Sequence, residues 1–213
     1  MKNYKLRRIL LTLACAVLLV SLSVGATLAY LTSTPTKVTN TFVVGEVKIE
    51  LDEADVDGSK TNVTTEGRDK ENAYHLYPAK TFDQDPTVHV LTGSEKCYVF
   101  VKVENGIADI ETEEEGKTIA EQMEAKGWFA VPGYESQNIY YYGSETKATI
   151  AEAGNNLIVF EKFTIASDVQ AAELATYATA QIVITAYAIQ EDGFDATKPA
   201  EIWAAFATQH PIV

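Results

Sequence analysis

Alternation of apolar and polar residues is the strongest local signal in the chain. From residue 43 to residue 51, Val47, Ile49 and Leu51 share one side of an extended backbone, and Glu46, Lys48 and Glu50 share the other. A period of two predicts a half-buried strand. Residues 96–104 are apolar on both sides at their centre, which predicts a central strand covered on both faces.

Similar segments recur to the end of the chain. Further strands are predicted at residues 87–91, 128–133, 138–144, 156–165 and 179–190. Helical spacing predicts short helices at 116–128 and 166–176, and a terminal helix at 198–210 with Pro199 in its first turn. Seven to nine short strands with helical insertions predict one mainly β domain, an antiparallel β-sandwich of the jelly-roll or Ig-like type.

The first 29 residues have the layout of a secretory signal peptide. A basic start precedes a hydrophobic stretch, Ile9–Val24, and Thr27 and Ala29 then occupy positions −3 and −1 of a small-x-small cleavage site before Tyr30. Sixteen residues span about 24 Å as a helix, less than a bilayer core of about 30 Å. We therefore expect a secreted domain whose precursor alone contacts the membrane. An uncleaved membrane anchor remains an alternative, because residues 9–31 are uncharged.

Composition narrows the classes of partner and chemistry. The chain has 30 acidic and 17 basic residues, a formal net charge of −13, and this excess disfavours binding to nucleic acid and anionic lipid. Of the two cysteines, only Cys97 would remain after cleavage, so no internal disulfide is expected. Cys97 is then a buried strand residue or pairs between molecules.

The acidic segment after residue 52 has part of the residue pattern of an EF-hand calcium-binding loop. Glu53, Asp55 and Asp57 fit positions 1, 3 and 5 of an EF-hand loop, but position 12 is Thr64 in place of glutamate. We expect a solvated surface loop, with these three carboxylates as weak candidates for binding a hard cation.

Catalytic motifs are scarce. His75, His89 and His210 lack the spacing of a zinc peptidase, and no Gly-x-Ser-x-Gly sequence occurs. The sequence predicts a non-enzymatic protein without a cofactor. Tyr140, Tyr141 and Tyr142 leave open a carbohydrate-binding or host-binding module, in which the rings stack on sugars.

Two stretches carry a resemblance to a known family. They are "GATLAYLTSTPTKVTNTFVVGEVKIEL" (25–51) and "LYPAKTFDQDPTVHVLTGSEKCYVFVKVEN" (76–105). They resemble the TasA/camelysin family of Gram-positive bacteria, secreted proteins released by a dedicated signal peptidase, SipW. The resemblance implies a jelly-roll domain that polymerises, with itself or with a related subunit, into extracellular biofilm-matrix fibres. Camelysin-type relatives have been classed as metallopeptidases, which is a further alternative.

In fibre-forming members of that family, the N-terminal segment freed by cleavage inserts as a strand into the next subunit. Here that segment is residues 30–41, before a domain of residues 42–213, and the donor candidates are Tyr30, Leu31, Val38, Phe42 and Val43. An extended, threonine-rich segment suits pairing with an open sheet edge, and head-to-tail pairing grows a filament. The alternative is that residues 38–51 form the domain's own first strand behind a loose leader.

Overall fold

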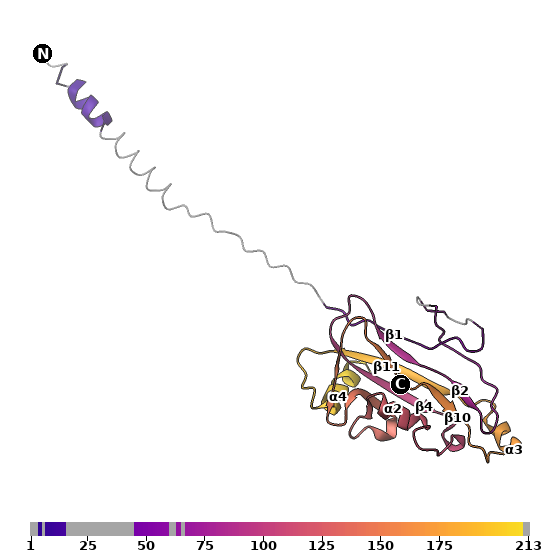
Figure 1. Cartoon of the computed structure of the whole chain (residues 1–213). Helices are drawn as coiled ribbons and strands as arrows, with labels where there is room; N and C mark the ends of the chain where they lie inside the picture. Colours follow the sequence, from indigo (N-terminus) through magenta and orange to yellow (C-terminus); the bar gives the residue numbers. More distant parts are fainter. Residues whose placement is uncertain (1–3, 6, 16–44, 60–62, 65–66, 211–213) are drawn as a thin grey trace. The chain divides into compact units, whose positions relative to one another are not determined.

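The computed structural model describes residues 4–5, 7–15, 45–59, 63–64 and 67–210 (Figure 1). The chain divides into two units, Met1–Val43 and Val44–Val213. In the first, the described residues are helical, and no helix in the described part of the chain is long and apolar enough to cross a bilayer. The predicted cleavage and donor residues lie outside the described residues: Thr27, Ala29, Tyr30, Leu31, Val38, Phe42 and Val43.

The second unit is built mainly from antiparallel sheets, as predicted (Figure 1). The largest has the order β11 (Ile182–Gln190), β4 (Cys97–Asn105), β6 (Ile139–Ser144) and β5 (Trp128–Ala130); β8 (Ile150–Ala151) pairs with β4, and β7 (Lys147–Ala148) with β6. Another has the order β1 (Ile49–Asp52), β3 (Thr87–Val90) and β9 (Asn156–Ile158). The smallest joins β2 (Thr81–Asp83) to β10 (Lys162–Thr164).

Short helices connect the strands, and one further helix, α4, follows the last strand. They are η1 (Ala108–Ile110), α2 (Ile119–Ala125), η2 (Glu135–Gln137), α3 (Ala171–Leu174), η3 (Ala175–Tyr177) and α4 (Pro199–Gln209). Helix α2 begins at a capping box, in which Thr118 and Glu121 satisfy each other's backbone N–H groups. Helix α4 confirms the predicted terminal helix, with Pro199 in its first turn where a missing N–H costs nothing.

Strand β4 divides the apolar interior into two clusters, which confirms its predicted central place. Cys97, Val99, Val101 and Val103 pack into one cluster, and Tyr98 and Phe100 on the opposite face pack into the other. Trp203 of α4 closes the second cluster, with its ring centroid 5.2 Å from that of Phe100.

The strands predicted at 128–133 and 179–190 are shorter in the structure, and two other predicted strands differ more. The regular part of the first begins at Ile49 and ends at Asp52. The strand predicted at 156–165 is two strands, because β9 pairs with β3 while β10 pairs with β2. The chain therefore passes from one sheet to another at residues 159–161, a change that uninterrupted apolar character does not reveal.

Candidate functional site: a buried charge network beside a groove

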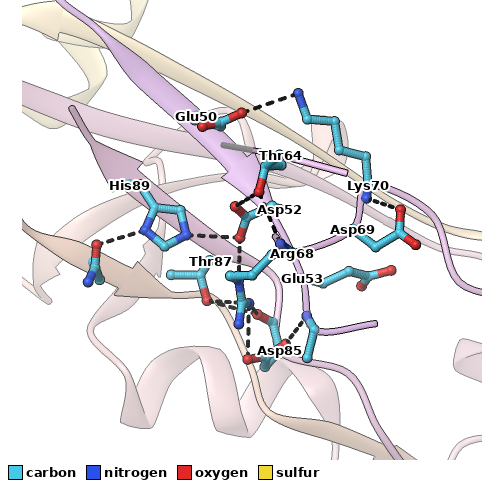
Figure 2. Close-up of polar contacts among 12 residues, drawn as sticks. Glu50, Asp52, Glu53, Thr64, Arg68, Asp69, Lys70, Asp85, Thr87 and His89 are labelled. Carbon is cyan, nitrogen blue, oxygen red and sulfur yellow. Dashed lines mark hydrogen bonds and ion pairs between the residues drawn. The ribbon is translucent and has the colours of Figure 1, made fainter. Parts of the chain in front are cut away.

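Asp52, at the end of β1, is the centre of a buried polar network (Figure 2). Its side chain is 1% exposed. It accepts hydrogen bonds from Thr64 Oγ1 at 3.1 Å, Arg68 Nε at 2.5 Å and His89 Nε2 at 2.8 Å. Three donors, two from the loop after β1 and one from β3, compensate for the loss of water around this carboxylate.

Arg68 extends the network toward the start of β3. Its Nη2 lies 3.0 Å from Asp85 Oδ2 and also donates to the carbonyl oxygen of Asp85 at 3.0 Å. The guanidinium group thus lies between two carboxylates, Asp52 and Asp85. Its planar fork of donors holds the loop after β1 against the loop before β3.

His89 joins all three strands of its sheet. It lies on β3, and its Nε2 faces Asp52 of β1 while its Nδ1 is 2.7 Å from Asn156 Oδ1 of β9. An imidazolium donates to both oxygens. A neutral ring donates only once, and then requires the Asn156 amide to turn its NH2 toward the ring. The ring thus connects Asp52 of β1 to Asn156 of β9 across β3.

Glu53 belongs to a second polar group on the other side of the strand. It is 8% exposed and accepts from Asn72 Nδ2 at 2.8 Å and from Gln84 Nε2 at 3.0 Å. Burial raises the pKa of Glu53, and the neighbouring charges of Asp85 and Asp69 add to the rise. Its donors are neutral amides. Oε1 of Gln84 is buried without a hydrogen-bond partner among the described residues.

The predicted set of calcium ligands is not assembled as the sequence suggested. Asp55 and Asp57 do come together, but with Asp69, their carboxylate oxygens within 4.8 Å of one another. Glu53 points into its own network instead, because its carboxylate is held by Asn72 and Gln84. The acidic loop was also predicted to be solvated, and this is wrong for Glu53, which is 8% exposed; Asp69, in the wider predicted surface loop, is fully buried.

Hydrogen bonds within the loop explain the positions of the Asp55 and Asp57 carboxylates. Asp55 Oδ1 accepts from the N–H of Gly58 at 2.6 Å, and Asp57 accepts from the N–H groups of Ser59 and Ala73, each at 2.7 Å. Hydrogen bonds lower the pKa of Asp57, first that of the Ser59 side chain and then those of the Ala73 and Ser59 N–H groups. The carboxylates therefore serve as backbone acceptors that shape the loop.

A groove of about 990 Å³ borders both polar groups. Its lining includes the segment 70–76, the first part of β11, Ile182–Ile184, and residues of α3 and η3. The apolar residues lining it include Leu51, Tyr74, Leu76, Pro86, Ile107 and Phe163. Acidic residues Asp52, Glu53 and Glu71 also line it, so the groove combines an apolar surface with negative charge.

Two of the lining segments leave backbone groups without a backbone partner among the described residues, although the N–H of Ala73 donates to Asp57. Strand β11 is the edge of its sheet among the described strands, and the residues that flank it, Gln181 and Glu191, bond to Gly106 and Lys96, which flank β4. Backbone direction alternates along an antiparallel strand, so Ile182 and Ile184 present their N–H and C=O groups at the outer edge. Across the groove, no backbone–backbone hydrogen bond between described residues involves residues 71–76. Alternate residues of this segment, Asn72, Tyr74 and Leu76, are half-buried, as in a strand.

The other candidates from the sequence occupy separate places. His75 and His210 are exposed, whereas His89 is buried in the network, and the acidic group of Asp55, Asp57 and Asp69 contains no histidine. Tyr140 and Tyr142 are half-buried against the first cluster, and Tyr141 is buried in the second. They do not form an exposed platform. Cys97 is fully buried, which raises its pKa to about 11 and keeps it away from other molecules.

Comparison with known proteins adds no relative. No protein-family model matches the chain, and neither a curated protein nor a solved structure matches it. The network and the groove are therefore interpreted from their own geometry. Sequence reasoning missed Arg68, His89 and Gln84 as members of the site, because each lies far along the chain from the residues it contacts.

Proposed function

We propose that this chain is a secreted structural protein, a subunit of an extracellular fibre of the biofilm-matrix type. Its domain would be a sandwich of jelly-roll topology. After cleavage before Tyr30, the freed N-terminal segment pairs as a strand with the next subunit. The observation that carries this proposal is the outer edge of β11, where the backbone groups of Ile182 and Ile184 form no hydrogen bond with the described residues and border a groove lined by apolar side chains.

An exposed strand edge favours such pairing. Unpaired backbone groups accept an added strand through main-chain hydrogen bonds, and neighbouring side chains fill the adjoining groove. Lys37 is the one charged side chain of residues 30–44, which are rich in threonine and valine, and these favour extended backbone. Because donor and acceptor are different surfaces of the same chain, each added subunit offers a new acceptor and the assembly does not close.

Deletion of the segment tests the proposal. We expect protein that starts at Tyr30 to form filaments visible by negative-stain electron microscopy. Protein lacking residues 30–40 should remain monomeric, with unchanged circular dichroism, because Val44–Val213 is a unit of its own. Normal filaments from the truncated protein would contradict strand donation. N-terminal sequencing of secreted material checks the cleavage site.

The alternatives receive less support from the geometry. A carbohydrate-binding surface needs exposed rings, and Tyr140 and Tyr142 are half-buried against the core. A metallopeptidase needs histidines gathered around a metal, and the three histidines lie in different surroundings. Binding to a glycan array would support the carbohydrate-binding alternative. Casein cleavage that a chelator abolishes would support the metallopeptidase.

A further inference from the structure

We propose that the groove lined by Glu53 and Gln84 binds a small organic amine, with its ammonium group beside these two side chains and its hydrocarbon body against the apolar lining. We call this surface the amine groove. The proposal goes beyond the proposed function and does not depend on it, because it rests on side chains of the groove and not on backbone pairing or on the N-terminal segment.

Glu53 is a buried carboxylate that forms no ion pair with another described residue. It lines the groove and is 8% exposed. The basic side chains of this region are engaged elsewhere: Arg68 lies against Asp52, and Lys70, which also lines the groove, is 3.5 Å from Glu50. A carboxylate removed from water is stabilised by a cation that brings its own hydrogen-bond donors. The groove therefore favours a positively charged ligand.

Two neutral amides hold Glu53 and leave hydrogen-bond acceptors unused. Asn72 Nδ2 donates to Glu53 Oε1 at 2.8 Å, and Asn72 Oδ1 accepts from the N–H of Val56 at 2.9 Å, which fixes the orientation of that amide. Gln84 Nε2 donates to Glu53 Oε2 at 3.0 Å, and Gln84 Oε1 is buried without a partner among the described residues. An ionised carboxylate accepts up to about four hydrogen bonds. Acceptors are therefore in excess around Glu53 and Gln84.

Hydrogen-bond chemistry selects a primary ammonium group as the cation. It carries three N–H donors around one atom and no acceptor, so it binds the Glu53 carboxylate and the Gln84 oxygen together. Because Oε1 of Gln84 is buried, its amide rotates toward the ligand on binding. A guanidinium group aligns best on a carboxylate with both oxygens free, and here each oxygen of Glu53 already accepts from an amide. A quaternary ammonium group has no N–H to donate.

The remainder of the lining suits a hydrocarbon body. The groove measures about 990 Å³, at the upper end of the range of about 300–1,000 Å³ for small-molecule sites. Burial of each CH2 group of a ligand against apolar side chains adds to its affinity. Several apolar lining residues are half-buried, which leaves part of each side chain exposed: Leu51, Tyr74, Leu76, Leu174, Tyr177 and Ile182. The lining therefore favours an amine with a hydrocarbon chain over a bare inorganic cation.

Calorimetric titration of the full chain with simple amines tests the class of ligand. We expect hexylamine to bind about four- to fifteenfold more tightly than butylamine, because it buries two more CH2 groups. Hexyltrimethylammonium, which keeps the charge without N–H donors, and 1-hexanol, which lacks the charge, should each bind at least about tenfold more weakly than hexylamine. Absence of hexylamine binding, or equal binding of hexylamine and its trimethyl analogue, would overturn the proposal.

A pair of matched substitutions tests the role of Glu53. Glu53→Gln keeps the shape of the side chain and removes its charge, so we expect the affinity for hexylamine to fall at least about tenfold. Glu71→Gln removes the same charge from an exposed residue of the same lining, and should lower the affinity less than about twofold, since water screens that carboxylate. Equal losses would indicate general attraction of cations to a chain of net charge −13 and would overturn the assignment of Glu53.

Side-chain amide signals in nuclear magnetic resonance spectra test the location directly. We expect the NH2 signals of Asn72 and Gln84 to shift as hexylamine is added, because both amides contact the carboxylate that the ligand binds. Gln137, an exposed residue of η2 outside the groove lining, is the control and should not shift. Binding that leaves the Gln84 signals unchanged, or shifts those of Gln137 equally, would overturn the amine groove as the binding site.

Discussion

Two regions of this protein are stabilised by different forces. Strand β4 is covered on both faces by apolar side chains, with Phe100 and Val101 fully buried. The end of β1 is equally inaccessible at Asp52, yet it is held by charges and hydrogen bonds from Thr64, Arg68 and His89. The comparison teaches that burial alone does not tell which residues may be exchanged: apolar contacts tolerate similar shapes, whereas a buried charge needs its own partners.

The largest expected effect is in the apolar region. Trp128 is 1% exposed, and its Nε1 donates to the carbonyl oxygen of Ile158 at 2.8 Å. Trp128→Ala leaves a cavity and an unpaired carbonyl, so we expect the free energy of unfolding to fall by about 3–5 kcal/mol in urea titrations. Phe129→Ala, at the half-buried neighbour, is the control and should cost less. Equal losses would contradict the dominance of the buried cluster.

The second prediction distinguishes the region held by charges at the end of β1 from the apolar region around β4. Asp52→Asn preserves shape but leaves Arg68 and His89 facing a neutral amide, so we expect a loss of about 2–4 kcal/mol by the same titration. Asp85→Asn is the matched control, because its side chain is 33% exposed and Arg68 keeps Asp52. A loss for Asp52→Asn no larger than for Asp85→Asn would show that the network adds little to stability.

A smaller effect concerns pH. The folded-state pKa of Glu53 is raised above 4.5, so the folded protein favours the protonated form, and ionisation of Glu53 lowers stability as pH rises through that region. Glu53→Gln should therefore be as stable as the unmodified protein near pH 4 and more stable at pH 7, by about 1 kcal/mol or less.

Glu121 provides the opposite sign. Hydrogen bonds from Thr118 lower its pKa, so its contribution is present above pH 4.5 and is lost as pH falls through the lowered pKa. Glu121→Gln should be less stable than the unmodified protein at pH 7 and equal to it in acid. Thermal unfolding between pH 3 and pH 7 measures both trends. Trends of the same sign would contradict a raised pKa for Glu53.

The smallest effect is at the surface. Lys96 and Glu152 lie 2.8 Å apart with side chains 59% and 58% exposed. Water and salt screen such a pair, so Lys96→Ala, Glu152→Ala and their combination should leave the urea midpoint unchanged. A measurable coupling free energy between the two substitutions would show that surface ion pairs contribute more to the stability of this acidic protein than we infer.

Much of the fold could be predicted from local pattern. Strand β4 was predictable because its alternating and continuous apolar residues specify a strand covered on both faces, and α4 because Pro199 precedes a run at helical spacing. The break between β9 and β10 could not be predicted, since Val159 and Phe160 continue the apolar pattern while the chain changes sheets. The candidate site was predictable only in Asp55 and Asp57 coming together, without their partner Asp69.

By itself, the sequence determined the class of fold, because hydrophobic burial follows periods that are visible within a few residues of each other. Only the tertiary structure decided which charges are buried. Asp52, Arg68 and His89 look like the chain's many solvated charges and stand 16 to 37 positions apart, yet sheet pairing and loop closure bring their atoms within hydrogen-bond distance. The reason is physical: a charge is stable in the interior only with partners, and partners so distant in sequence meet only when the chain is folded.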